Sequence, residues 1–333
     1  MKKVLSLILA LAMVFALAAC GEKQPSNDGN TDGDKPARGN VIMTFGTADT
    51  GGSMYPAGAA VSQVWTNNVQ GVKCNTQTST GSFQNCQDVS TGEVDVAVAT
   101  SDVVLNAYNG TGKFADIGKL DNLRVIGAVY TSVLSGVALK SSGLTYIHDL
   151  LGKRVAVGPA ASATENATLA AFDAMGIDSS NTSLENLGLG DGADSVGDGI
   201  LDAAFGFAGL PIGGQLNLAA TKEIQVLDMT QEEIDKVLAG NAAYIQTKIP
   251  AGTYTGQDNH ANTFGVKCLI IVTADMDADL VYDLCKAMNE HTEEMAAGNA
   301  LLKDMTDPSF LCTQMPIPLH DGAQKYYSEQ GLI

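Results

Sequence analysis

The chain has 333 residues, of which 45% are hydrophobic, and a formal net charge of -18 from 19 Lys and Arg against 37 Asp and Glu. This length allows two ordinary domains, and the hydrophobic content is enough for buried cores and argues against a largely disordered chain. The acidic balance disfavours a nucleic-acid surface or an anionic membrane patch, and the three arginines leave backbone amides and hydroxyls as the main groups for holding an anion.

The first twenty residues have the pattern of a bacterial export signal. Two lysines precede an apolar stretch at residues 4–19, which is too short and one-sided for a stable membrane span. The run Leu17-Ala18-Ala19-Cys20 resembles the lipobox of bacterial lipoproteins, whose cysteine receives lipid. We expect residues 1–20 to be a lipoprotein signal peptide. Cys20 would then anchor the protein by lipid alone to the outer face of the bacterial cytoplasmic membrane, in a periplasm or at the cell surface.

Residues 21–40 are polar and predict a flexible linker. Asp28, Asn30 and Asp32 within it match the first half of a calcium-binding loop. However, position twelve of that loop is Gly39, where a bidentate Glu is required, and no helical pattern flanks it. We therefore favour a solvated linker and predict no metal site and no cofactor.

Five cysteines remain after Cys20, and none forms a metal-spaced pair. Their odd number argues against a complete disulfide framework, and each lies in an apolar run. The sequence favours buried core thiols. The five are Cys74, Cys86, Cys268, Cys285 and Cys312.

A glycine-rich loop at residues 46–56 lies between an apolar run and a helical pattern. This order predicts a strand, a loop and a helix start, with Ser53 able to cap the helix and Pro56 in its first turn. Such a loop leaves backbone N–H groups unpaired at a helix end, where the helix dipole favours negative charge. The loop is a candidate anion pocket.

The chain repeats this unit twice. A strand over residues 72–78 leads to a second helix start, where Ser82 is the expected cap. Another strand, over residues 153–158, leads to a third, where Ser162 and Glu165 spell a capping box. Glu165 could cap the helix or contact a cationic group of a ligand, and the residues leave both open.

Further strands complete an α/β pattern. A buried strand over residues 94–99 places Thr100, Ser101 and Asp102 at its carboxyl end, where open α/β sheets bind ligands. Residues 123–129 and 136–139 predict two strands separated by a polar break at Thr131-Ser132, and residues 264–272 predict a return strand. An amphipathic helix is expected over residues 280–295.

Two segments look like copies of one another. Residues 92–97 and 199–204 both read as a helix-ending glycine, two residues, an aspartate and a buried strand, and each follows a strand–loop–helix unit. We predict two α/β lobes, each a mostly parallel sheet with flanking helices, joined by crossing strands. Lobe 1 would comprise residues 41–135 and 265–333, and lobe 2 residues 136–264.

The chain resembles the TAXI-type solute-binding proteins of TRAP transporters from about residue 41 to its end. The likeness is carried by residues 46–56, 77–85 and 158–165, and by residues 249–254 together with 316–320. The resemblance implies a type II periplasmic-binding-protein fold that closes on a small ligand, such as glutamate, glutamine or a related carboxylate. It also implies a cation-driven TRAP membrane permease as partner. We expect the receptor itself to be a monomer.

The chain departs from the family pattern in its loops. Thr80, Ala161 and Ala163 stand where the family usually has glycine, and Thr100 stands where it has Gln. These changes narrow backbone freedom and bring a methyl group near the ligand, which favours a smaller or differently shaped ligand. A ligand's anionic group would meet the amides near Ser53, Gly81 and Ser162, and an amino group would meet Asp102 or Glu165. The full expected ligand set is Gly52, Ser53, Tyr55, Ser79, Thr80, Gly81, Ser82, Asn85, Thr100, Ser101, Asp102, Ala161, Ser162, Ala163, Thr164, Glu165 and Phe207.

Other function classes have less support. The motifs H-E-x-x-H, G-x-S-x-G and G-x-x-x-x-G-K-[ST] do not occur, which disfavours an enzyme. Residues 188–192 have the glycines of a dinucleotide loop, but Asp191 would stand where the pyrophosphate sits. A receptor that feeds a signalling sensor, instead of a transporter, stays open.

Overall fold

The structure is a computed structural model that describes residues 39–50 and 52–333. The predicted signal peptide, the predicted lipidation at Cys20 and all but the last residue of the loop considered for calcium lie outside these residues, as does nearly all of the predicted linker.

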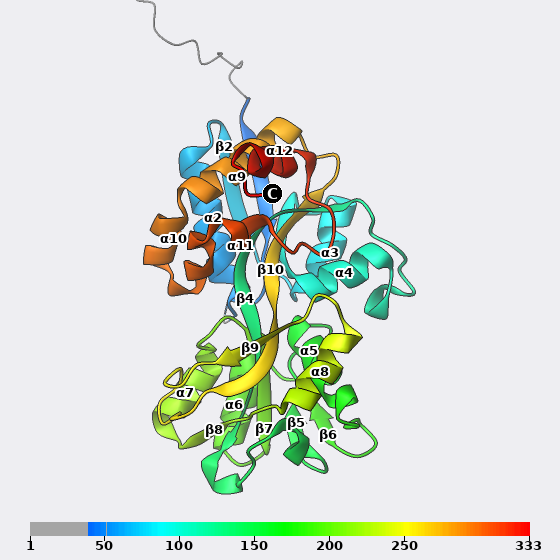
Figure 1. The fold of residues 1–333 in the computed structure, drawn as a ribbon, viewed down its shortest axis with the longest axis vertical. Helices are drawn as coiled ribbons and strands as arrows, with labels where there is room; N and C mark the ends of the chain where they lie inside the picture. The colour runs from blue at the N-terminus through cyan, green and yellow to red at the C-terminus, as the bar shows by residue number, and fades with distance from the viewer. Residues whose placement is uncertain (1–38, 51) are drawn as a thin grey trace, which may run out of the picture. The chain divides into compact units, whose positions relative to one another are not determined.

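One continuous sheet runs through the described part of the chain (Figure 1). Its strand order is β2-β1-β3-β10-β4-β7-β5-β6, with β8 paired to β4 and β9 to β10. The strands are β1 (Val41–Gly46), β2 (Val72–Gln77), β3 (Val96–Thr100), β4 (Leu123–Leu139), β5 (Arg154–Ala156), β6 (Ser183–Glu185), β7 (Ala203–Ala208), β8 (Ile224–Val226), β9 (Ile245–Ile249) and β10 (Ala261–Thr273).

Helices cover both faces of this sheet. They are α2 (Met54–Asn68), α3 (Ser82–Thr91), α4 (Ser101–Asn109), α5 (Ala163–Ala174), α6 (Leu189–Gly197), α7 (Gly213–Thr221), α8 (Gln231–Gly240), α9 (Ala278–Glu290), α10 (Thr292–Gly298), α11 (Pro308–Cys312) and α12 (Asp321–Glu329). Short 3-10 turns include η1 (Gly112–Phe114) and η4 (Ala300–Thr306).

The long strands β4 and β10 divide the sheet into two lobes. They pair antiparallel from Leu123 to Val133, and β4 then continues to pair with β7 and β8. Lobe 1, the upper one in Figure 1, contains the parallel strands β1, β2 and β3 with helices α2–α4 and α9–α12. Lobe 2 contains the parallel strands β5, β6 and β7 with helices α5–α8.

Each lobe has one hydrophobic core on each face of its sheet. In lobe 1 one core packs α2, α9 and α12 and the other packs α3 and α4; in lobe 2 one packs α5 and α8 and the other α6 and α7. The predicted architecture of two α/β lobes joined by crossing strands is therefore confirmed. The exact boundaries at residues 135 and 264 stay a prediction.

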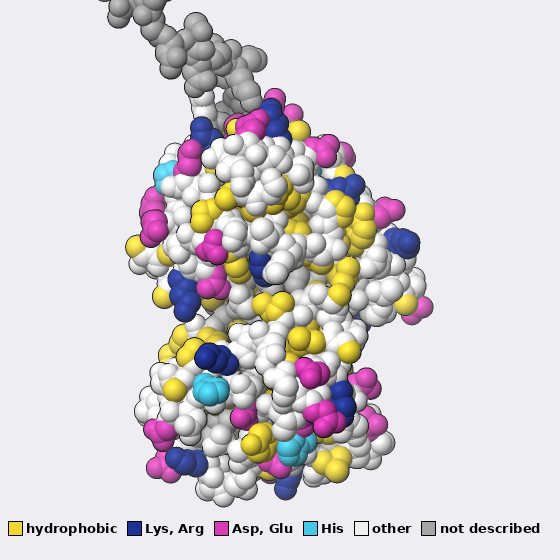
Figure 2. Space-filling view, viewed as in Figure 1, with side chains coloured by type: hydrophobic (Ala, Val, Ile, Leu, Met, Phe, Trp, Pro, Cys, Tyr) yellow, Lys and Arg dark blue, Asp and Glu magenta, His cyan; other side chains and the backbone are white. Residues whose placement is uncertain are grey.

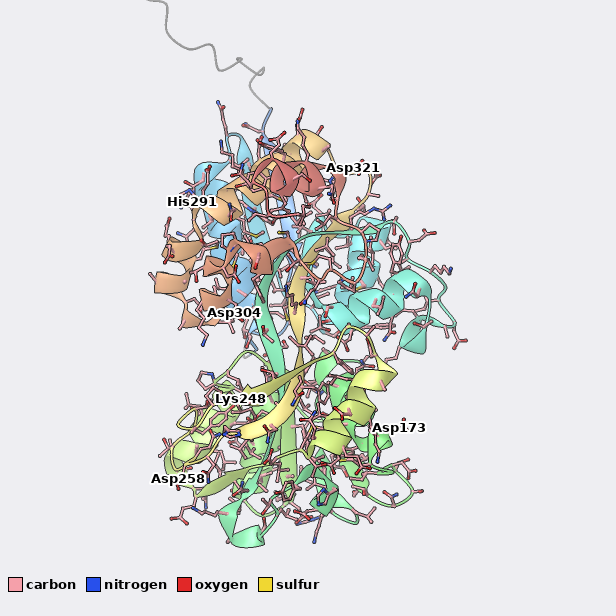
Figure 3. All side chains as sticks on the ribbon, in the orientation of Figure 1. Asp173, Lys248, Asp258, His291, Asp304 and Asp321 are labelled. Atoms are coloured by element: carbon pink, nitrogen blue, oxygen red, sulfur yellow. The ribbon has the colours of Figure 1, made fainter. Side chains whose placement is uncertain are left out.

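The predicted break in the first crossing is wrong, because β4 is continuous. The two polar residues at its centre find partners inside the structure. Thr131 Oγ1 donates to Asp304 Oδ2 at 3.0 Å, and Ser132 Oγ lies 3.1 Å from Cys268 Sγ. Figure 3 shows Asp304 beside β4, where the two lobes meet. Hydroxyls that are satisfied in this way do not interrupt a strand.

The single helix predicted over residues 280–295 is also wrong. His291, labelled in Figure 3, leaves the helical conformation with ψ near 19°, so that α9 ends and α10 begins on either side of it.

The two similar segments occupy equivalent places in the lobes. Asp95 Oδ2 accepts the backbone N–H of Thr44 on β1 at 2.7 Å, and Asp202 Oδ2 accepts that of Arg154 on β5 at 2.8 Å. Each aspartate directly precedes a buried strand and fixes it to the neighbouring parallel strand. The second lobe thus repeats the construction of the first.

All five cysteines of the described residues are buried free thiols. No helix in this part of the chain combines the length and apolar character needed to span a bilayer. The described residues include no group of three or more His, Cys, Asp or Glu side chains that could hold a metal ion.

Candidate functional site

A cavity of about 570 Å³ lies between the two lobes. Lobe 1 contributes the loop after β1, the loop before α3 and Tyr130 of β4. Lobe 2 contributes the loops before α5 and α6 and the end of β7. The lining residues are Ala48, Asp49, Gly52, Ser53, Met54, Ser79, Thr80, Gly81, Ser82, Tyr130, Pro159, Ala160, Ser162, Ala163, Thr164, Gly188, Leu189, Gly190, Asp191, Phe207 and Ala208.

Four helices begin at this cavity, two from each lobe. They are α2 and α3 from lobe 1 and α5 and α6 from lobe 2, and residues from the first turn of each line the cavity. Each helix start carries a partial positive charge and backbone N–H groups without a partner in the helix. Four such ends make the cavity a favourable place for a negative charge.

Three of the four helix starts have no side-chain cap. The Ser53 side chain makes no cap bond to α2, and Gly81 before α3 and Gly188 before α6 have no side chain that could make one. At α5 the Ser162 hydroxyl accepts the Glu165 N–H at 3.1 Å, so the cap predicted there is confirmed. The caps predicted at Ser53 and Ser82 are wrong.

Side-chain charge at the cavity is sparse and acidic. Among the described residues that line it there is no Lys, Arg or His, and the charged ones are Asp49 and Asp191. Its walls also include Met54, Tyr130 and Phe207. Any anion held here would be bound by backbone amides and hydroxyls, as the scarcity of arginine predicts.

The first two loops are held in place by Asn85. This buried side chain donates to Thr47 O at 2.5 Å and to Val98 O at 2.7 Å, and its Oδ1 accepts from the Ser79 hydroxyl at 2.7 Å. In the same loop Gly81 has φ +114°, a backbone conformation that residues with a side chain rarely adopt. Asn85 therefore lies behind the cavity wall and fixes the loop that forms it.

Ser82 connects the second helix to the end of β3. Its hydroxyl accepts the backbone N–H of Thr100 at 3.1 Å, and it does not cap α3 because it is the first residue of that helix, with Gly81 at the N-cap position. Thr100 is fully buried and does not line the cavity.

The third loop is fixed to β7. Gly158 has φ +97°, and a Cβ there would lie 2.6 Å from Cβ of Thr164. The Thr164 hydroxyl accepts the Phe207 N–H at 3.1 Å. The start of α5 and the aromatic wall of the cavity are therefore held together.

Glu165 makes its contacts away from the cavity. It forms an ion pair with Lys113 of lobe 1, and its carboxylate also accepts the Ala161 N–H at 2.8 Å and a bond from Asn186 at 2.9 Å. Burial raises its pKa, but these donors outweigh burial and hold the pKa below its usual value. The cationic partner of Glu165 is thus a lysine of the other lobe.

Asp102 is fully buried where α4 meets lobe 2. Its Oδ2 accepts the Asn166 amide at 2.8 Å and the Tyr244 hydroxyl at 3.2 Å. Burial raises the pKa of the Asp102 carboxyl above its ordinary value, and the hydrogen bonds it accepts offset only part of this effect.

The structure brings part of the predicted ligand set together at the cavity. The residues that line it are Gly52, Ser53, Ser79, Thr80, Gly81, Ser82, Ser162, Ala163, Thr164 and Phe207. The others do not: Tyr55, Asn85, Thr100, Ser101, Asp102, Ala161 and Glu165. Ser101 lines a separate cavity with Lys267. The ligand role of all these residues stays a prediction.

Sequence reasoning missed two parts of the wall. Tyr130 is an aromatic residue inside an apolar strand and has no local signal of its own. The start of α6 does have a local sequence signal, since its glycines at 188 and 190 resemble those of the other loops. The same stretch also resembles a dinucleotide loop, and this resemblance conceals its likeness to the other helix starts.

Comparison with known proteins identifies both the family and the fold. The model of the NMT1-like family matches residues 45–331. Among solved structures, PhnD1 from Prochlorococcus marinus in complex with methylphosphonate shares 10% identity over 88% of this chain and 99% of that chain, with a TM-score of 0.54.

Two further structures are similar at lower TM-scores. The alkanesulfonate-binding protein SsuA from Xanthomonas axonopodis pv. citri, bound to MOPS, shares 14% identity over 88% of this chain and 85% of its own, with a TM-score of 0.49. A putative L-cystine ABC transporter protein from Listeria monocytogenes shares 16% identity over 80% and 94%, with a TM-score of 0.47. The likeness to PhnD1 confirms the predicted type II periplasmic-binding-protein fold.

Proposed function

The chain belongs to the NMT1-like family, and from this premise and the cavity between its lobes we propose that it is a receptor for a small carboxylate or amino acid. The family and the fold are those of solute-binding proteins and not of enzymes. The observation that carries the proposal is the meeting of four helix starts at one cavity.

The chemistry of the cavity favours a small anion with an apolar part. Backbone N–H groups at the helix starts can donate to a carboxylate, and the helix dipoles add attraction. The volume of about 570 Å³ lies within the usual range for small-molecule sites. A glutamate-like or glutamine-like molecule has the carboxylate that the helix starts would bind, and Asp191 in the cavity wall would attract its ammonium group.

The mechanism would be closure and release. A ligand that contacts α2 and α3 of lobe 1 together with α5 and α6 of lobe 2 binds the closed arrangement more tightly than an open one. The difference between the ligand's affinities for the closed and the open arrangement sets how far the ligand shifts the equilibrium between them.

A thermal-shift screen tests the proposal directly. The purified chain is heated with a panel of amino acids and organic acids, and a ligand at 100 times its Kd should stabilise the protein by about 2.7 kcal/mol. A panel with no effect on the melting temperature would contradict the proposal.

A matched pair of variants tests the sign of the charge. Thr80 is exposed and lines the cavity. Thr80→Asp should abolish the rise in melting temperature caused by an anionic ligand, because the new carboxylate repels it. Thr80→Asn introduces an uncharged side chain of nearly the same shape as Asp and should retain most of that rise. Equal shifts in both variants would indicate that the ligand's charge does not lie near this helix start.

We further propose a TRAP-type secondary transporter as the partner. Its support is the resemblance of residues 46–56, 77–85 and 158–165 to TAXI-type receptors. Uptake of radiolabelled ligand into membrane vesicles of the source bacterium, with this chain added, should follow a sodium or proton gradient. Uptake that requires ATP instead would identify an ABC transporter as the partner.

The proposed location is the outer face of the cytoplasmic membrane, with a lipid on Cys20. Labelling with radioactive palmitate should mark the wild-type chain and not Cys20→Ala. Unlabelled wild-type protein would contradict the anchor without affecting the receptor proposal.

A further inference from the structure

Two groups of polar contacts join the lobes beside the cavity, and none of their side chains lines it. In the first, Asp102 of lobe 1 accepts hydrogen bonds from Asn166 and Tyr244 of lobe 2. In the second, Lys113 of lobe 1 pairs with Glu165 of lobe 2. Neither group therefore includes a side chain that would contact a ligand in the cavity.

The Asp102 contact is strongly shielded from water. Asp102 is 0% exposed, and its Oδ1 has no hydrogen-bond partner among the described residues. Asn166 and Tyr244, which donate to Oδ2, both belong to the other lobe, while Thr100 and the Val103 N–H of lobe 1 also stabilise the carboxylate. Opening the lobes would exchange these two bonds for bonds to water, so they favour the closed arrangement by their net strength and not by the full cost of an unsatisfied buried acceptor.

The Glu165 carboxylate is already positioned before it meets Lys113. Within lobe 2 it is held by the Ala161 N–H and by Asn186, and its side chain is 15% exposed. Lys113 is 39% exposed, so water weakens the pair. A fixed carboxylate nevertheless loses little freedom on pairing, which makes the contact more favourable than one between two mobile side chains.

We propose that Asn166, Tyr244 and the Lys113–Glu165 pair form an interlobe clamp that favours the closed arrangement without ligand. They act as positioning residues, because they bring the helix starts of both lobes to the cavity before binding. The apparent affinity for a ligand falls with the fraction of molecules that are open, so a protein that is mostly closed before binding keeps more of its intrinsic affinity. The inference rests on the proposed opening and closing of the lobes and not on the identity of the ligand.

Small-angle X-ray scattering of the full chain without any small molecule tests the clamp. The wild-type chain should have the smaller radius of gyration, and Tyr244→Phe combined with Lys113→Ala should raise it. Tyr254→Phe is the matched control, because the Tyr254 hydroxyl accepts the Ile212 N–H inside lobe 2. It should leave the radius of gyration unchanged.

Asn166→Ala provides an independent variant if the Tyr244 change disturbs folding. Asn166 is only partly buried, so the variant should keep its circular dichroism spectrum while its radius of gyration rises. A purely structural role would lower the melting temperature and leave the radius of the folded chain unaltered.

Equal radii for the wild-type chain, the combined variant and Asn166→Ala would overturn the clamp. A failed ligand screen would overturn the receptor proposal alone, since the scattering experiment contains no ligand. The two failures are therefore distinguishable.

Discussion

The Thr164 hydroxyl accepts the backbone N–H of Phe207, and so connects the start of α5 to the strand that carries the aromatic wall of the cavity. Thr164→Val keeps the shape of the side chain and removes this acceptor. The variant should lose about 1–3 kcal/mol of unfolding free energy, because the buried Phe207 N–H is left without a partner. Urea unfolding followed by circular dichroism measures the change.

Thr168 is the matched control on the same helix. It is fully buried, and its hydroxyl oxygen has no hydrogen-bond partner among the described residues. Thr168→Val should therefore be neutral or stabilising. If both variants lost the same stability, the Thr164 bond would not be responsible for the effect.

Ala161 has φ +60°, the left-handed region that favours glycine. This conformation costs a residue with a Cβ about 1–2 kcal/mol, whereas glycine adds about 0.5–1 kcal/mol of unfolded-state entropy. Ala161→Gly should thus raise the unfolding free energy by up to about 1 kcal/mol in urea melts. Ala163→Gly, at the first residue of α5, should lower it. A loss of stability in Ala161→Gly would show that the backbone there is not strained.

The Asp202 carboxylate makes stability depend on pH. Its bond from the Arg154 side chain lowers its pKa, and burial opposes this only in part. A lowered pKa stabilises the fold above the unfolded value of about 3.9, and this contribution is lost as the pH falls through the folded pKa.

The melting temperatures of wild type and Asp202→Asn should therefore differ at pH 7 and converge in strong acid. The difference should correspond to about 1 kcal/mol or less, as expected for a partly exposed ion pair. Arg154→Gln should weaken the same pH dependence. A gap that widens in acid would refute this assignment.

Gly209 of lobe 2 lies against Leu301 of lobe 1. A Cβ at Gly209 would lie 1.8 Å from Leu301 Cδ1 and 3.4 Å from Ser53 Oγ. Gly209→Val should hold the lobes apart and weaken ligand binding about tenfold if the closed fraction falls to about a tenth. Isothermal titration calorimetry measures this loss with whichever ligand the thermal screen identifies.

A second-site change makes the Gly209 prediction specific. Leu301→Ala removes the obstructing atoms and should restore binding to Gly209→Val. Gly213→Val is the control, because a Cβ at Gly213 meets nothing within 4 Å. Failure of the rescue would mean that Gly209→Val acts on lobe 2 itself.

Local patterns predicted most of the fold and much of the cavity wall. Glycines and small polar residues between an apolar strand and an amphipathic helix define three of the four helix starts, since that geometry depends on neighbouring residues alone. The duplicated aspartate also had a local signature, and Asp95 and Asp202 make the same bond in both lobes.

Contacts between distant residues could not be predicted in this way. Ser82 fits a cap by its residue type, but α3 begins at Ser82 itself, and its hydroxyl bonds instead to Thr100 at the end of β3. Glu165 fits a cap or a ligand contact, and its cationic partner is a lysine 52 positions away. The distribution of surface charge does not mark a binding site on the face seen in Figure 2 either, because acidic and basic side chains are interspersed there.

The continuity of β4 and β10 has a consequence for inheritance. Both strands belong to the sheets of both lobes, so neither lobe is a self-contained module. Recombination between relatives could not exchange one lobe without replacing parts of two paired strands in register. Exchange of whole lobes is therefore disfavoured, and variation is expected to accumulate in the loops that connect the strands to the helices.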